Sequence, residues 1–210
     1  MSALSPRATA VVYQVASRTL DYPDEQLLAD IPMMRAALRE VPTSFAAPLG
    51  RLLDHIAAAP TESLAADYVA TFDLRRRCCL YLSYYAYGDT RKRGVALLAF
   101  KQSFRRGKVE LSTNELPDHL CVVLEFAATA DLARGRKMLL EHRAGLEMLR
   151  LALQDGDSPW ADGVAAVTAT LPALQGEERR AVARLAAEGP PGEEVGLEPF
   201  APPDVMGAHA

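Results

Sequence analysis

The sequence predicts an all-α protein built as a single domain. Apolar residues recur every three or four positions along most of the chain, which is the spacing of amphipathic helices, and no segment requires a strand. Proline, glycine and aspartate residues separate these periodic segments, as expected where helices begin and end. The 210 residues are 50% hydrophobic, so the chain can bury a sizeable core. We expect a helical domain over residues 1–188.

The first part of the chain is predicted to divide into short helices at its prolines. Residues 7–20 carry apolar side chains at helical spacing and stop before Pro23, because the residue that precedes a proline is disfavoured in the helical region. A second helix is expected to begin at Asp24 and to be interrupted or restarted at Pro32. Further helices are expected at residues 33–39, 49–56 and 61–72.

A tyrosine-rich segment follows at residues 73–88, again with helical spacing and with Gly88 as a helix stop. Four tyrosines fall within seven positions, namely Tyr81, Tyr84, Tyr85 and Tyr87. Tyrosine combines an apolar ring with a hydroxyl group, which suits either the edge of a core or a recognition surface. The core edge is the more frequent outcome, and both interpretations stay open. Residues 91–106 then predict a helix that Gly107 ends.

Residues 115–134 predict an amphipathic helix with an unusual polar face. Pro117 fits a first helical turn, and Asp118 suits the positive end of the helix dipole. At 100° per residue, Asp118, Val122 and Glu125 fall on the side opposite the leucine and valine residues. His119 and Phe126 lie on the flank between the two arcs.

This predicted helix admits a functional interpretation and a purely structural one. A face with two carboxylates, an imidazole and an aromatic ring suits a short basic or amphipathic peptide, and neither carboxylate has a basic neighbour three or four positions further along the helix. The structural alternative is a core helix with a solvated acidic back. Asp118 and Glu125 would be two turns, about 10 Å, apart, which suits a cationic partner better than acid–base chemistry on one bond.

The C-terminal part continues the helical pattern and then changes composition. Helical spacing extends over residues 138–153, 164–171 and 179–188, with a turn at residues 155–160. Residues 189–210 are rich in proline, glycine and acidic side chains, which cannot form a packed core. We therefore expect a flexible tail over residues 189–210.

The net charge of −4 conceals a basic segment in the middle of the chain. Residues 75–108 contain ten Lys or Arg side chains and one acid, Asp89. Such a segment could attract nucleic acid, but its charges alternate with apolar core positions, as on a solvated helix face. We therefore predict no nucleic-acid partner. Salt-dependent binding to arbitrary DNA would support the alternative, a helical regulator.

The sequence lacks the patterns of common enzymes, metal sites and membrane segments. There is no nucleophile elbow, phosphate-binding glycine loop or metal-binding helix signature, and the four histidines are scattered. The three cysteines suit buried free thiols better than disulfides or zinc ligands. No apolar run could span a bilayer, and the N-terminus lacks the order of a signal peptide. We expect a cytoplasmic protein with no catalytic residues, metal or cofactor.

Several longer motifs resemble a known family. They are LDYPDE at residues 20–25, YVATFDL at 68–74, YLSYYAYGDTRKRG at 81–94 and LPDHLCVVLEFAA at 116–128. Together they resemble the NarJ family of nitrate reductase assembly chaperones over most of residues 10–150. The resemblance implies an all-helical domain of the molybdoenzyme-chaperone type. It also implies a cytoplasmic chaperone that is no part of the finished enzyme.

The partner implied by this resemblance is the apo catalytic subunit of the membrane-bound respiratory nitrate reductase, bound chiefly at its N-terminus until the molybdenum cofactor is inserted. Molybdenum cofactor biosynthesis proteins are further candidate partners. The implied client-binding residues are Asp118, His119, Val122, Glu125, Phe126, Tyr81, Tyr84 and Tyr85. A chaperone for a related molybdoenzyme and a helical carrier of a small ligand or cofactor are the alternatives, and a carrier would retain or transform a small ligand.

Overall fold

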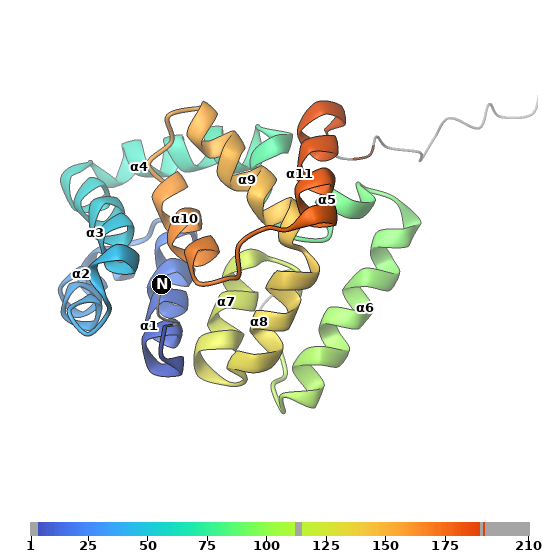
Figure 1. Cartoon of the computed structure of the whole chain (residues 1–210). Coiled ribbons are helices and arrows are strands. Elements are labelled where there is room, and N and C mark those ends of the chain that lie inside the picture. Colours follow the sequence, from blue (N-terminus) through green and yellow to red (C-terminus); the bar gives the residue numbers. More distant parts are fainter. Residues whose placement is uncertain (1–3, 112–114, 190, 192–210) are drawn as a thin grey trace, which may run out of the picture.

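The computed structural model describes residues 4–111, 115–189 and 191, and these ranges are helical without any strand (Figure 1). An isolated antiparallel bridge between Tyr81 and His119 is the one β-type pairing within them. The prediction of an all-α fold is therefore confirmed. Among the described helices, none has both the length and the apolar composition needed to cross a bilayer. The predicted tail lies almost wholly outside the described residues.

Helix α1 (Pro6–Thr19) lies in the centre of the core and confirms the first predicted helix. The Ser5 hydroxyl oxygen accepts the backbone N–H of Ala8 at 3.2 Å and so caps the first turn. α1 packs against α7 (Leu120–Thr129) and α10 (Ala161–Ala169). Between α1 and the end of α10, the Tyr13 hydroxyl lies 2.8 Å from Thr170 Oγ1, which satisfies two polar groups inside the core.

Helix α2 (Glu25–Leu38) runs through Pro32, so the predicted interruption there is wrong. A proline removes one helical hydrogen bond and crowds the preceding turn. Here Asp24 caps the start of the helix through the backbone N–H of Leu27, at 2.7 Å. Four buried side chains hold both halves of α2 on the core, namely Leu27, Ile31, Met34 and Leu38. Helices α3 (Thr43–Ala58) and α4 (Thr61–Tyr68) follow.

The long helix predicted over residues 73–88 is wrong. A π-helical turn (Val69–Asp73), a 3-10 turn (Arg76–Cys78) and the one-turn helix α5 (Tyr84–Tyr87) occupy this region instead. The backbone between the last two is extended, because Leu80 and Leu82 form hydrogen bonds with a distant part of the chain. The tyrosines therefore point in directions that helical periodicity cannot predict.

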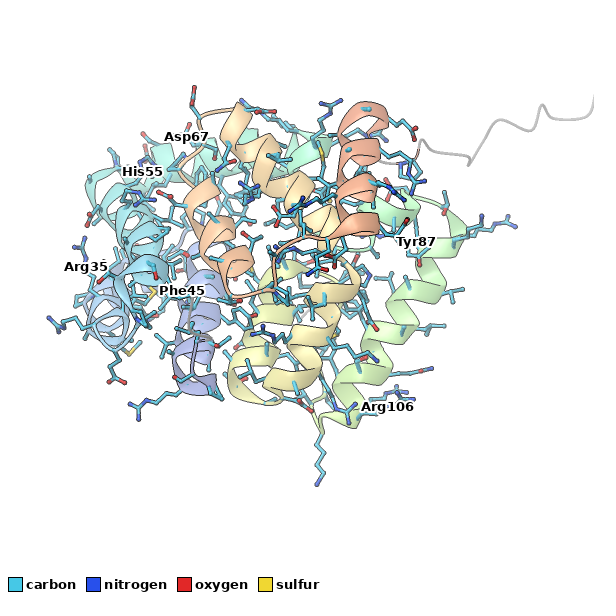
Figure 2. All side chains as sticks on the ribbon, viewed as in Figure 1. Arg35, Phe45, His55, Asp67, Tyr87 and Arg106 are labelled. Carbon is cyan, nitrogen blue, oxygen red and sulfur yellow. The ribbon has the colours of Figure 1, made fainter. Side chains whose placement is uncertain are left out.

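Helix α6 (Arg91–Arg106) forms one edge of the domain, on the side away from α1–α3 (Figure 1). Gly107 follows its last turn as predicted. Phe100 and Phe104 are its only buried side chains among the described residues. Figure 2 shows Tyr87 just before the start of this helix and Arg106 at its far end. α6 thus has a long outward face.

Two predicted helix boundaries in the second half need correction. The helix expected over residues 115–134 begins only at Leu120 and ends at Thr129, after which the Asp131 side chain caps α8 (Leu132–Glu141). The helix expected over residues 138–153 is divided at His142 into α8 and α9 (Arg143–Asp155). α7 and α8 cross closely at Gly135, where a Cβ atom would overlap Ala127. Helix α11 (Gly176–Glu188) packs on α9.

Candidate functional site

The two longest motifs of the sequence meet at a short stretch of paired backbone. The backbone N–H of Leu82 donates to the Asp118 carbonyl oxygen at 2.9 Å, and the N–H of Leu120 donates to the Leu80 carbonyl oxygen at 2.8 Å. In a helix through residues 117–119, these backbone N–H and C=O groups would bond within the helix. Here they bond to residues 80–82 instead, and the backbone is extended at His119. They place the tyrosine-rich segment against the start of α7.

Asp118 is fully buried, with 0% of its surface exposed. Its Oδ2 atom accepts hydrogen bonds from the backbone N–H of Ser83 at 3.3 Å and from the Ser83 hydroxyl group. The Arg93 Nη2 atom lies 3.6 Å from the same oxygen and supplies a compensating positive charge. The predicted exposed position of Asp118 on a helical face shared with Glu125 is therefore wrong. Its carboxylate connects three separate segments inside the protein.

Arg93 is the cationic partner in this arrangement, which we call the Asp118 cluster (Tyr81, Ser83, Arg93, Asp118 and His119). Besides Asp118, its guanidinium group pairs with Asp89 one helical turn earlier, at 2.9 Å. The guanidinium carbon also lies 5.1 Å from the centroid of the Tyr81 ring, a cation–π distance. Arg93 belongs to the first turn of α6, so the cluster fixes that end of the helix to the start of α7.

Tyr81 and His119 form the outer side of the Asp118 cluster. Their ring centroids are 5.2 Å apart in an edge arrangement, and the Tyr81 hydroxyl donates to Glu115 at 2.8 Å. Burial, followed by the hydrogen bond to Glu115, raises the pKa of Tyr81. Burial lowers the pKa of His119, so the imidazole is neutral at physiological pH. His119 is therefore buried before the start of α7 and does not lie on the flank of a helix as predicted.

The remaining residues predicted on α7 separate into accessible and inaccessible ones. Glu125 is exposed and Val122 is half-buried, so both face outward on α7. Phe126 is buried, and its ring centroid lies 4.7 Å from that of Phe104 on α6. The structure therefore does not gather the five residues predicted on this helix into one binding face, because Asp118, His119 and Phe126 are buried.

Tyr84 and Tyr85 are both buried, and Tyr85 joins α5 to α9. Its hydroxyl group lies 2.8 Å from the Cys79 carbonyl oxygen and 3.0 Å from that of Arg77. A Cβ atom at Gly145 would come within 2.7 Å of the Tyr85 Cβ, so this glycine lets the two elements approach closely. Burial raises the pKa of Tyr85. The core interpretation holds for these two tyrosines, although one edge of Tyr85 borders a cavity described next.

Two adjoining hollows lie beside these tyrosines, and we call them together the client groove, after the client that we propose they bind. The larger hollow, about 340 Å³, lies between α5, the α8–α9 junction and α11; its lining includes Leu82, Tyr85, Ala86, His142, Ala144 and Gly145. The smaller, about 250 Å³, lies between α6 and α8 and is lined by Tyr87, Ala96, Ala99, Phe100, Ser103, Met138, Glu141 and His142. Glu141 and His142 border both hollows, so the two adjoin at the end of α8.

The client groove is more apolar than polar, and a few charged side chains border it. Alanine and glycine residues leave room in it, and Tyr85, Tyr87 and Phe100 contribute aromatic rings to its lining. Glu141 is the acidic side chain on the body of the domain that borders it, between α8 and α9. Such a surface fits an amphipathic helix that places apolar side chains in the depression and a basic one near Glu141. No group of described residues could hold a metal ion.

A sequence model of the nitrate reductase delta subunit family matches residues 38–166. The chain belongs to this family. The NarJ resemblance is thereby confirmed, and the matched residues include both hollows of the client groove except for the part contributed by α11.

Relatives in the family differ in size and in name. The nitrate reductase-like protein NarX of Mycobacterium tuberculosis is 42% identical over 167 residues, which are 76% of this chain but 24% of NarX. The chain thus spans about a quarter of that relative. The probable nitrate reductase molybdenum cofactor assembly chaperone NarJ of Bacillus subtilis is 29% identical over 72% of this chain and 83% of its own length. This relative is named as an assembly chaperone.

The Escherichia coli assembly chaperone NarJ is also 29% identical, over 70% of this chain and 64% of its own length. A crystal structure described as a redox enzyme maturation protein from Archaeoglobus fulgidus has the same fold, with a TM-score of 0.56. It covers 76% of this chain and 91% of its own, with 21% sequence identity. The helical architecture is therefore one that this family shares with a more distant protein.

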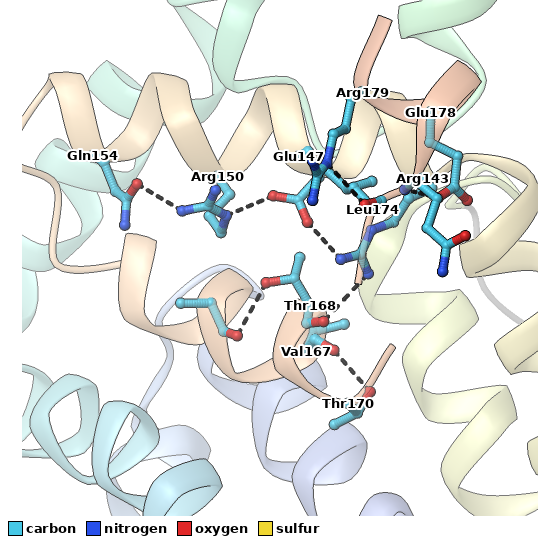
Figure 3. A network of polar contacts seen from close by, with 12 residues as sticks. Arg143, Glu147, Arg150, Gln154, Val167, Thr168, Thr170, Leu174, Glu178 and Arg179 are labelled. Atoms are coloured by element: carbon cyan, nitrogen blue, oxygen red, sulfur yellow. Dashed lines mark hydrogen bonds and ion pairs between the residues drawn. The ribbon is translucent and has the colours of Figure 1, made fainter. Parts of the chain in front are cut away.

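An additional polar network, which periodicity alone did not reveal, lies on α9 (Figure 3). Arg143 and Glu147 are buried and form an ion pair at 2.7 Å, and Arg150 pairs with the other oxygen of Glu147 at 2.7 Å. Arg143 also donates to the Thr168 carbonyl oxygen of α10 at 3.2 Å. Burial lowers the pKa of Arg143. The network fixes α9 to α10, and therefore fixes one wall of the client groove.

The cysteines match the expectation of free thiols. All three are free, with Cys78 and Cys121 buried and Cys79 half-buried. Burial raises the pKa of Cys79 to about 11. The thiol is therefore protonated and unreactive at physiological pH, which agrees with a structural role.

Substitution of the two carboxylates should separate the structural from the exposed one. Asp118→Asn removes the negative charge at a fully buried site and should lower the free energy of unfolding by about 1–3 kcal/mol, because the charge-assisted hydrogen bonds from Ser83 are weakened and Arg93 loses one of its two carboxylate partners. Glu125→Gln removes a charge from the exposed side of α7 and should change it by less than about 0.5 kcal/mol. Urea denaturation followed by circular dichroism measures both. Equal stability of the two variants would contradict the structural role of Asp118.

Proposed function

We propose that this protein is an assembly chaperone for respiratory nitrate reductase, which binds the catalytic subunit before its molybdenum cofactor is inserted. The observation that supports this most is the client groove, an apolar depression between helices in a chain that belongs to the nitrate reductase delta subunit family. The NarJ relatives carry the name of molybdenum cofactor assembly chaperones. A cytoplasmic location is part of the same proposal.

The client segment that the groove fits best is an N-terminal peptide of the catalytic subunit, bound as an amphipathic helix. A helix is about 10 Å across with its side chains, so it lies along an elongated depression rather than inside a closed cavity. Tyr85 in the larger hollow and Phe100 and Met138 in the smaller one would take the apolar side of the helix. Glu141 offers a charge to a basic residue beside it. This combination matches recognition of a helix in a groove.

The residues predicted to bind the client take different roles in this proposal. Tyr85 borders the groove directly. Asp118, His119 and Tyr81 act indirectly, because the Asp118 cluster holds the start of α6 in place and α6 is one groove wall. Tyr84 and Phe126 support the walls from inside the core. Val122 and Glu125 stay candidates for a second, peripheral contact on the outward side of α7.

Two related functions give different experimental results. A chaperone for another molybdoenzyme would capture a different catalytic subunit from cells that contain several. A cofactor carrier would retain the molybdenum cofactor after purification, whereas a chaperone of the proposed kind would bind a client peptide without retaining one. Direct contact with molybdenum cofactor biosynthesis proteins is a further proposal, which co-purification from the native host would test.

A bulky side chain in the groove should block the client. Ala99 is exposed and lines the hollow between α6 and α8, so Ala99→Trp fills the hollow without disturbing the core. Val95 is 71% exposed on the same helix and borders neither hollow, which makes Val95→Trp the matched control. Calorimetry with the N-terminal peptide should show binding about tenfold weaker, or about 1.4 kcal/mol, for Ala99→Trp alone. Equal affinity in both variants would place the client elsewhere.

Cells that carry Ala99→Trp on the chromosome should make nitrate reductase that is short of cofactor rather than short of protein. The physical reason is that the catalytic subunit is synthesised normally but is not held in a state that accepts the cofactor. Molybdenum and catalytic subunit should be quantified in the purified enzyme, with Val95→Trp cells as control. A full molybdenum content in the Ala99→Trp enzyme would contradict the proposed function.

A further inference from the structure

Helix α11 packs on α9 but is held there by apolar contact rather than by polar bonds between side chains. Among the described residues, its side-chain hydrogen bonds and ion pairs are all local. Glu177 pairs with Arg180 at 2.7 Å, Arg179 donates to the Leu174 carbonyl oxygen at 2.9 Å, and Glu178 accepts the Gln175 N–H at 3.1 Å. Val182 is its one buried side chain within that part of the chain.

The way in which α11 meets the domain resembles the binding of a separate helix. The side chains that it places against the larger hollow are Ala181, Arg184, Leu185 and Glu188, with the spacing i, i+3, i+4 and i+7. This is the anchor spacing of an amphipathic helix laid into an apolar groove. Opposite them lie Leu82, Tyr85, Ala144 and Gly145 on the body of the domain.

The contact between α11 and the groove is incompletely packed. The hollow of about 340 Å³ between them is a cleft open to solvent, so α11 covers the groove without filling it. Arg184 and Glu141 both border this hollow, so α11 brings a basic side chain to the acidic edge of the groove. In size, spacing and charge, α11 therefore has the features that the proposed client helix needs, with weaker packing than a permanent core helix.

We propose that α11 covers the larger hollow of the client groove in the free protein and that the client helix displaces it. This inference rests on the proposed function and adds a regulatory step to it: the groove is covered until a better-fitting helix arrives. The displacing partner is an amphipathic helix with apolar residues at i and i+4 and a basic residue at i+3 that faces Glu141. Larger apolar side chains than Ala181 and Leu185 would fill the remaining hollow and favour the exchange.

A resident helix lowers the apparent affinity for the client. If only a fraction of molecules has α11 displaced, the apparent dissociation constant is the intrinsic one divided by that fraction. A substitution that loosens α11 should therefore tighten client binding, which is the opposite of the effect of damaging a binding surface. This difference in sign makes the proposal testable.

Val182→Asp in the full chain tests the displacement, because it places a charge at the buried anchor of α11. The matched control is Ala183→Asp, which adds the same side chain to the exposed side of the same helix. Calorimetry with the N-terminal peptide of the catalytic subunit should give about tenfold tighter binding for Val182→Asp and less than about a twofold change for Ala183→Asp. Weaker or unchanged binding by Val182→Asp would overturn the proposal.

Hydrogen exchange on the parent protein gives an independent measurement. Backbone amides of α11 should exchange faster than those of α9 in the free protein, and faster again once the peptide is saturating. One outcome separates the two proposals: the peptide binds, Ala99→Trp blocks that binding, and α11 keeps its protection in the complex. The displacement of α11 would then be wrong, while the proposed function would stand. If the peptide binds neither the parent nor Val182→Asp, both are wrong.

Discussion

The burial of the Asp118 carboxylate is the constraint on which the rest of this architecture depends. A carboxylate without solvent needs hydrogen-bond donors and a counter-charge, and it obtains them from Ser83 and Arg93, on two other segments. Because Arg93 lies in the first turn of α6 and Asp118 precedes α7, satisfying the Asp118 carboxylate fixes one end of α6 to the centre of the domain. The two phenylalanines of α6 hold the remainder, and its other side chains are free to form the wall of a groove.

The same arrangement explains why the most distinctive residues of the sequence are structural rather than exposed. The tyrosine motif and the Leu-Pro-Asp-His motif are paired through backbone hydrogen bonds between residues 80–82 and 118–120. They build a rigid frame beside the groove, and the groove itself is lined by ordinary alanine, phenylalanine and methionine side chains. α11 completes the groove on one side, with a loosely packed contact that suits exchange for another helix.

Helical periodicity was sufficient for the elements that lie within one segment and insufficient for those that depend on distant contacts. It predicted α1, and it predicted α6 up to its terminal glycine. It failed at residues 117–119, because a proline and an aspartate mark a helix start and a turn equally well, and the deciding bonds come from a segment some 35 positions earlier. For the same reason it could not predict that Arg93 neutralises Asp118. Tyr85 was a predicted site residue that does border the groove, whereas Tyr87, Ala99 and Met138 gave no signal beyond that of ordinary helix positions.

The central claim, that an N-terminal helix of the catalytic subunit binds along the client groove, is tested most directly by nuclear magnetic resonance of the isotope-labelled protein titrated with that peptide. The account predicts that the largest shift changes occur at residues of both hollows, among them Ala96, Ala99 and Met138, and at the Ala144–Gly145 start of α9. Intermolecular nuclear Overhauser contacts should join the peptide to Tyr85 and Phe100. Shift changes confined to the outward side of α7 around Val122 and Glu125, with the groove residues unaffected, would contradict it.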